Sequence, residues 1–241
     1  MQAYWRDSRA PRYSLLFALP LFLLYQILVA LEPRSPAGIL RNGADVILQT
    51  LFERIAGARG PHLFLACLIG VGVWLVVRDL RANHRDLKVG VLVLMVVESV
   101  LLALALGLFV STLTSQLVRP TALLVQVPVA DLTLRTRVML SLGAGLYEEL
   151  LFRVLLVGTI AWAGRRLLGW RPLVAGAWAA VLGALLFSLF HYIGPYGDRL
   201  ELYSFVFRAI AGLVFSALFL ARGFGITAWT HALYDAFLLL R

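Results

Sequence analysis

The stretch LYEELLFR at residues 146–153 places two adjacent glutamates, Glu148 and Glu149, between long apolar runs. A charged side chain at the centre of a bilayer costs about 2.5–3.5 kcal/mol on insertion scales, and ionisable residues at that depth usually serve a function. The flanking runs predict that this glutamate pair lies inside a membrane span. We therefore expect the chemistry of the chain to be located here.

The composition predicts the class of fold. The chain has 241 residues, of which 61% are hydrophobic and 15% charged, whereas a soluble domain is about 45–50% apolar and about 25% charged. These values predict an all-α, polytopic transmembrane helical bundle with no soluble domain. The net charge is +9, but no basic run is interleaved with aromatic residues. Nucleic acid is therefore not an expected partner, and the lipid bilayer is.

About seven to eight membrane spans are expected, because a helix needs about 20 mostly apolar residues to cross a bilayer. Seven can be bounded, at 14–31, 62–77, 89–110, 137–163, 172–192, 202–221 and 224–240. The first lacks a small-x-small cleavage site, so it is predicted to be a retained helix and not a signal peptide. Segment 40–57 is predicted as an amphipathic surface helix. Segment 120–135 is predicted as a loop or a re-entrant piece; an eighth span hidden in either segment would alter the topology.

The basic residues predict the orientation in the membrane. With a cytoplasmic N-terminus, the cytoplasmic segments hold eleven Lys and Arg in 34 residues, and the outer segments hold nine over roughly twice that length. The positive-inside rule favours this arrangement. Lys88 is the only lysine among many arginines, which suggests a GC-rich bacterial genome. The expected location is the bacterial inner (plasma) membrane.

Eight ionisable residues fall inside the predicted spans: Glu98, Glu148, Glu149, Arg153, His191, Arg208, His231 and Asp235. Glu149 and Arg153 are four residues apart, so they share a helix face and can pair. Glu148 is rotated about 100° from Glu149 and is left free. The same four-residue spacing puts His231 and Asp235 on one face of the last helix.

Several ionisable residues, some inside the predicted spans and some outside them, are interpreted as structural. Glu98 is interpreted at least as readily as an interhelical hydrogen-bond partner as a catalytic group. Arg208 is expected to pair with a carboxylate of a neighbouring helix. His62 and His84 are expected to have no catalytic part. The single cysteine, Cys67, lies in an apolar run and is predicted to fill the core.

Three short motifs, each in an apolar helix, carry a family resemblance. Glu148-Glu149-x-x-x-Arg153 is followed by Phe187-x-x-x-His191 and then by His231-x-x-x-Asp235. This order and spacing resemble those of the intramembrane endopeptidases of the type II CAAX prenyl protease and Abi (CPBP) family, as a bacterial member. The resemblance covers residues 137–240. It divides the chain into N-terminal transmembrane helices with an amphipathic segment (1–136) and a four-helix catalytic core (137–241).

The resemblance implies an intramembrane protease of the glutamic type. Glu148 and His191 would activate a water, and Glu149 would pair with Arg153 in support. His231 and the residue at position 235 would stabilise the oxyanion.

Position 235 departs from the family pattern, because well-studied members carry asparagine there. An ionised aspartate cannot donate a hydrogen bond to an oxyanion. Asp235 would therefore either stay protonated or accept from His231 and fix its tautomer. No cofactor is favoured; zinc is the lesser option, and its ligands would be Glu148, His191, His231 and Asp235.

The predicted topology also suggests a substrate. With a cytoplasmic N-terminus, His191 lies near the outer end of its helix, so the site is expected to open toward the outer half of the membrane. The expected substrate is a membrane-anchored protein or peptide, for example a C-terminal sorting tail. A proton-coupled transporter is an alternative, against which stands the lack of an inverted repeat. A non-catalytic membrane protein of the same fold, of the bacteriocin-immunity type, is another.

Overall fold

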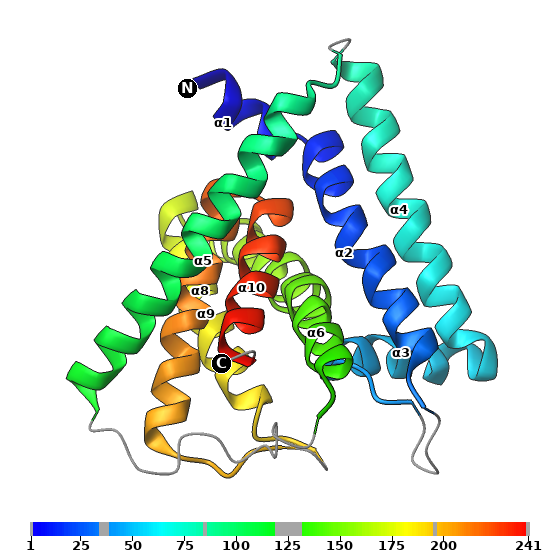
Figure 1. The fold of residues 1–241 in the computed structure, drawn as a ribbon. Helices are drawn as coiled ribbons and strands as arrows, with labels where there is room; N and C mark the ends of the chain where they lie inside the picture. Colours follow the sequence, from blue (N-terminus) through cyan, green and yellow to red (C-terminus); the bar gives the residue numbers. More distant parts are fainter. Residues whose placement is uncertain (1, 34–38, 84–85, 119–131, 195–196, 240–241) are drawn as a thin grey trace.

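The computed structural model describes residues 2–33, 39–83, 86–118, 132–194 and 197–239. Within these ranges the chain forms helices and no strand, as expected for an all-α bundle (Figure 1). The helices are α1 (Gln2–Arg9), α2 (Pro11–Leu31), α3 (Gly43–Ala56), η1 (Gly57–Arg59), α4 (Gly60–Ala82), α5 (Val89–Leu117), α6 (Leu134–Gly143), η3 (Ala144–Val157), α7 (Gly158–Leu167), α8 (Pro172–Phe190), α9 (Leu202–Arg222) and α10 (Phe224–Leu239).

The chain is a multi-pass membrane protein. Five stretches among the described residues are long and apolar enough to cross a bilayer: Pro11–Leu31, Gly43–Ala82, Val89–Leu117, Pro172–Phe190 and Leu202–Arg222. The predicted span 137–163 and the described part of the predicted span 224–240 are helical as well, but neither is a single long apolar helix. The first is divided among α6, η3 and α7, and the second is α10 with 16 residues. Both carry motif residues, which lowers their apolar content.

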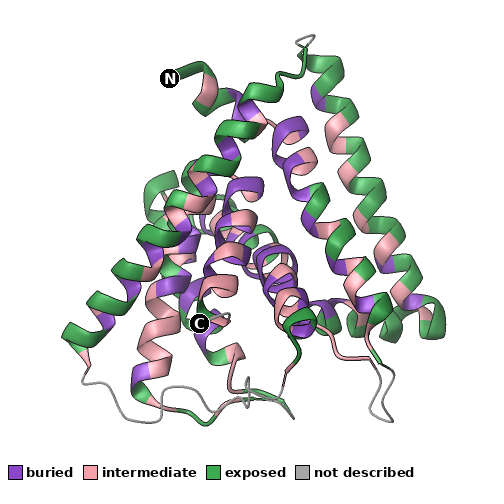
Figure 2. Ribbon diagram, in the orientation of Figure 1, coloured by how far each residue is buried: buried purple, intermediate pink, exposed green. Residues whose placement is uncertain are grey.

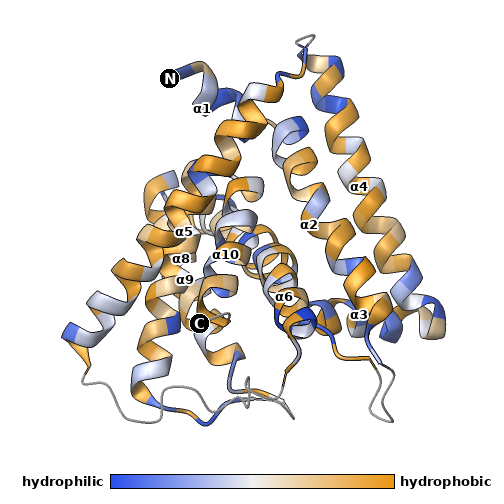
Figure 3. Ribbon diagram, in the orientation of Figure 1, coloured by the Kyte–Doolittle hydropathy of each residue, from blue (hydrophilic) through white to orange (hydrophobic). Residues whose placement is uncertain are grey.

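The outer helices turn hydrophobic faces away from the bundle. In Figures 2 and 3 the exposed sides of α2, α4 and α5 are also hydrophobic. Trp74 of α4 and Leu108 of α5, for example, are 55% and 72% exposed. Exposed apolar surface on this scale fits a lipid environment and not water. Cys67 lies on the exposed part of α4, so the prediction that it fills the core was wrong: an apolar run in such a helix faces lipid as well as protein.

The predicted amphipathic helix at 40–57 is confirmed as α3. It lies across one end of the bundle, where α2 ends and α4 begins (Figure 1). Asn42 caps its first turn, because the side-chain oxygen accepts a hydrogen bond from the Ala44 amide at 2.9 Å. Most of segment 120–135 lies outside the described residues; its last two residues begin α6.

The helix that carries the glutamates differs from the predicted α-helix. Residues Ala144–Val157 form a π-helix, in which the backbone bonds reach five residues back and not four. At its end the Gly158 amide donates to the carbonyl of Arg153. Such segments are rare and frequently occur at functional sites.

A glycine brings this π-helix close to the central helix α10. A Cβ added at Gly145 would lie 2.3 Å from the Ala228 carbonyl oxygen and 2.7 Å from the Ala232 Cβ. Only a residue without a side chain allows this approach. Helix α10 also packs against α2, α5, α6 and α9, and many of its residues are buried (Figure 2). The motif helix and α10 therefore meet backbone to backbone in the interior of the bundle.

Candidate active site

The centre of the site is a contact between the first and third motifs. His231 on α10 lies with its Nδ1 2.6 Å from Glu149 Oε1 on η3. The same oxygen is 3.2 Å from Arg153 Nη1, so Glu149 contacts two cationic or donating groups. All three side chains are buried, Glu149 completely. A carboxylate can only accept, so the Nδ1 of His231 carries the hydrogen and donates it.

This bond determines where the other ring nitrogen of His231 points. Its Nε2 lies 4.0 Å from Glu148 Oε2 and 3.7 Å from Asp235 Oδ2. Both distances exceed a hydrogen bond. One of the options for Asp235 was that it fixes the tautomer of His231; in the structure it is Glu149 that contacts Nδ1. Asp235 instead faces Nε2 together with Glu148.

Aromatic rings enclose these polar groups. Phe215 of α9 stacks on the His231 ring, with centroids 4.2 Å apart. Phe187 of α8 lies against both His191 and His231, and the guanidinium carbon of Arg153 is 4.4 Å from the centre of the Phe187 ring. These two rings restrict the rotamers of His231 and Arg153. The Arg153 charge also gains a cation–π contact.

His191 stands at the C-terminal end of α8 and is half-buried. Its Nδ1 is 2.9 Å from the carbonyl oxygen of Phe187, which can only accept. Nδ1 therefore donates, and in the neutral ring Nε2 is left as an acceptor. His191 also interacts electrostatically with Glu148. The histidine thus keeps Nε2 as a basic nitrogen and interacts with Glu148 through its charge.

One residue at the site was missed by sequence reasoning. Asn42, from the capping position of α3, donates its side-chain amide to Glu148 Oε1 at 2.9 Å. An asparagine before an amphipathic run does predict a helix cap. It gives no sign of a contact 106 residues away in the chain.

The other ionisable residues of the predicted spans lie outside this cluster. Glu98 pairs with Arg222 of α9, as the interhelical interpretation expected. Arg208 does pair with a carboxylate, but its partner Asp198 precedes its own helix and does not belong to a neighbouring one. Arg208 still interacts electrostatically with Asp235 at the rim of the site.

The donor types at the site suit zinc. However, among the described residues no group of three or more His, Cys, Asp or Glu side chains is arranged to hold a metal ion. Zinc therefore stays an untested option, which a chelator experiment can address.

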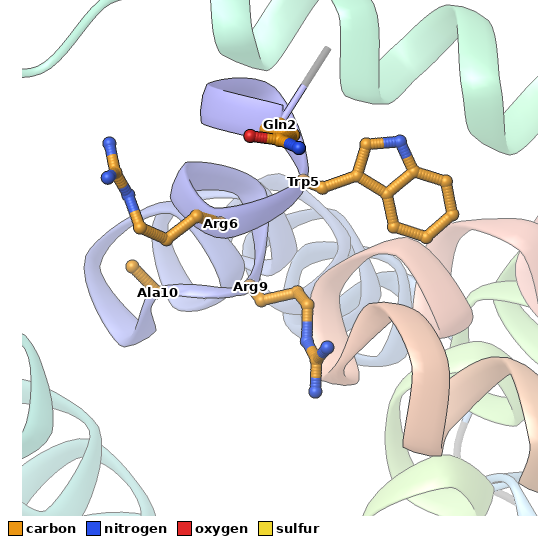
Figure 4. A pocket seen from close by; sticks show the side chains of 5 residues that line it. All are labelled: Gln2, Trp5, Arg6, Arg9 and Ala10. Carbon is orange, nitrogen blue, oxygen red and sulfur yellow. The ribbon is translucent and has the colours of Figure 1, made fainter.

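Two hollows lie on the surface. The larger, about 640 Å³, is lined by α1 and its neighbour Ala10, with Gln2, Trp5, Arg6 and Arg9 (Figure 4). It is at the end of the bundle opposite α3 (Figure 1), so it is separate from the glutamate–histidine cluster. The smaller, about 140 Å³, borders Tyr147, the residue before Glu148.

Carboxylates and imidazoles held among aromatic rings inside an apolar helical bundle define a class of membrane protein with a buried acid–base site. Residues 130–237 match the family described as type II CAAX prenyl endopeptidase Rce1-like. The match covers the part of the chain that carries the three motifs, agrees with the family predicted from them, and indicates a CAAX-type membrane protease. No curated protein and no solved structure matches the chain significantly.

Proposed function

We propose that this protease cleaves inside the membrane, hydrolysing a peptide bond of a membrane-anchored protein or peptide with water activated by Glu148 and His191. The main support is the orientation of His231. Glu149 holds its Nδ1 at 2.6 Å, and its Nε2 faces the carboxylate of Glu148. A donor fixed beside a general base, in a site closed off from water, is suited to stabilise an oxyanion.

In the proposed reaction, Glu148 and His191 remove a proton from a water molecule, and the water oxygen attacks the carbonyl carbon of the substrate. The new C–O bond forms while the carbonyl electron pair moves onto oxygen. His231 acts in its doubly protonated form: its Nδ1–H is held by Glu149, and its Nε2–H donates to the oxyanion. The C–N bond then breaks, and the same acid–base groups return the proton to the leaving amine. The products are one carboxyl and one amine terminus, and no further reactant is consumed.

Glu149 and Arg153 support this reaction without contacting the substrate. Arg153 balances the charge of Glu149 at 3.2 Å, and Glu149 orients His231. We propose that Asp235 acts in its protonated form, donating to the same oxyanion as His231. Its carboxyl group faces the same Nε2 atom, so both would reach a substrate oxygen placed between them.

The proposed substrate follows from the end of the bundle at which the site lies. Asn42 on α3 contacts Glu148, so the site is nearer the α3 end than the α1 end. With a cytoplasmic N-terminus this is the outer half of the bacterial inner membrane. A C-terminal sorting tail anchored there is the substrate that we propose. Labelling of a cysteine at position 191 in a Cys67→Ser background tests this; a thiol reachable only from the cytoplasm would contradict it.

The central test is cleavage of membrane peptides by the purified protein. Glu148→Ala and His191→Ala should each abolish cleavage, whereas His62→Ala should not, because His62 is exposed on α4. Cleavage that survives both of the first two substitutions would remove the water-activating assignment. The same cleavage assay in the presence of a chelator tests whether zinc is needed. Activity that is lost in chelator and restored by added zinc would favour the metal mechanism.

A further inference from the structure

We infer that Asn42 is a positioning residue for Glu148, so that the site is completed by a surface helix outside the matched domain. This inference rests on the proposed function. The side-chain amide of Asn42 lies 2.9 Å from Glu148 Oε1, and both residues are only 6% exposed. Position 42 is far from the matched residues 130–237, so the family match does not assign it a role.

The orientation of the Asn42 amide is determined by its second contact. Its oxygen accepts from the Ala44 amide at 2.9 Å as the cap of α3. An amide oxygen only accepts and an amide nitrogen only donates. Rotating the group by 180° would break the cap and turn an oxygen toward the Glu148 carboxylate. The nitrogen therefore faces Glu148.

A buried hydrogen-bond network holds the backbone of Asn42. Its amide N–H donates to Tyr25 Oη at 3.2 Å, and Tyr25 in turn donates to Asp45 at 2.8 Å. Asp45 is fully buried and also accepts from Arg41 and Gln49. The network ties the start of α3 to α2 and fixes the place from which Asn42 reaches the site.

The motif helix leaves room for Asn42. A Cβ added at Gly143 would lie 2.6 Å from the Asn42 Cβ and 2.6 Å from a ring carbon of Tyr25. Gly143 precedes Glu148 by five residues, directly before the π-helix. Any side chain at position 143 would push Asn42 away from Glu148.

Because of this hydrogen bond, the two carboxylate oxygens of Glu148 have different neighbours. Oε1 of Glu148 accepts from Asn42, whereas Oε2 faces His231 Nε2 at 4.0 Å. Oε2 is then the oxygen directed at the reacting water. Without the Asn42 amide the carboxylate is free to rotate, and a displacement of about 1 Å at a reacting group can cost about a hundredfold in rate.

The first experiment separates positioning from helix capping. Serine caps about as well as asparagine, but it has no amide and is too short to reach Glu148. Asn42→Ser should lower kcat about tenfold to a hundredfold with little change in KM, and should keep more of the wild-type melting temperature than Asn42→Ala. Full activity of Asn42→Ser would overturn the inference.

A matched pair of glycine variants tests the packing. Gly143→Ala should lower kcat as Asn42→Ser does, because the new methyl group occupies the place of Asn42. Gly70→Ala is the control: Gly70 lies in α4, where an added Cβ meets nothing within 4 Å. Equal activity of the two variants would contradict the inference.

A double-mutant cycle of melting temperatures tests the contact between Asn42 and Glu148 without an activity assay. Asn42→Ala should lower the melting temperature more in the wild type than in a Glu148→Ala background, because only the wild type loses the Asn42–Glu148 bond as well as the cap. Equal shifts in both backgrounds would overturn the contact. A wild-type protein that cleaves no membrane peptide would count against the proposed function alone, since this cycle still tests Asn42.

Discussion

Two buried polar clusters at opposite ends of the bundle differ in how completely their groups are bonded. At the α1 end, Glu98 accepts from Arg222 at 2.6 and 2.7 Å and from the Tyr4 hydroxyl. Arg222 also donates to Ser8, and of its guanidinium nitrogens only Nη1 has no hydrogen-bond partner among the described residues. Both oxygens of this carboxylate are therefore satisfied. The cluster joins α1, α5 and α9, and the charges in it stabilise one another as buried charges must.

At the α3 end, the cluster is less completely bonded. Among the described residues, Glu149 Oε2 and the three guanidinium nitrogens of Arg153 have no hydrogen-bond partner. Glu148 Oε2 faces His231 at a distance too long for a bond. Buried polar groups are normally paired, so each exception calls for an explanation. The comparison supports the proposal that the second cluster binds reacting groups, whereas the contacts of the first join helices to one another.

The largest expected difference is in activity. Glu148→Gln removes the proposed base and should lower kcat by about two to four orders of magnitude. Glu98→Gln, an equally conservative change in the other cluster, should leave kcat near the wild-type value. The measurement is steady-state cleavage of one membrane peptide by both purified variants. Similar losses in both would erase the functional distinction between the clusters.

The next effect is on stability. Arg153→Ala leaves the buried Glu149 with His231 as its only charge partner, and removing one partner of a buried pair costs about 3–5 kcal/mol. Thermal unfolding in detergent should show a clear fall, with lost activity as well. An Arg153→Ala protein as stable as wild type would mean that the 3.2 Å contact does not balance the charge of Glu149.

A smaller effect is expected at the α1 end. Burial and the bond to Glu98 raise the pKa of the Tyr4 phenol, so it remains a donor at neutral pH. Tyr4→Phe removes one hydrogen bond to a charged group, worth about 1.5–3 kcal/mol. The melting temperature should fall while kcat and KM stay unchanged. A change in kcat without a change in stability would instead connect α1 to the reaction.

The smallest effect is expected at position 235. Asp235→Asn restores the residue of the family pattern and supplies a permanent donor in place of the protonated carboxyl that we propose. Activity should persist, and any loss toward alkaline pH that comes from ionisation of Asp235 should disappear. The measurement is a pH profile of kcat for both proteins. Complete loss of activity in Asp235→Asn would show that the carboxylate form is required.

The sequence was sufficient for the apolar spans, for α3 and for the three motifs. These features depend on local composition and spacing, which a single chain displays. The pairing of Glu149 with Arg153 also follows from spacing, and the structure places the two side chains 3.2 Å apart.

Other features depend on contacts that local patterns do not contain. The π-helix has ordinary helix-forming residues, so its local sequence gives no sign of the altered backbone register. Asn42 reaches Glu148 through tertiary structure alone. Arg222 lies just outside the predicted span 202–221, yet it is the buried partner of Glu98, because the end of α9 packs against α1 and α5.

The exposed position of Cys67 gives this chain a ready spectroscopic reporter. It is the only thiol in the sequence, so a spin label or fluorophore attaches at a single place without removing other cysteines. Helix α4 packs against α2 and α3, the helices that carry Tyr25 and border Asn42. A probe at Cys67 would therefore report whether α4 shifts relative to the motif helices η3, α8 and α10 when a peptide enters.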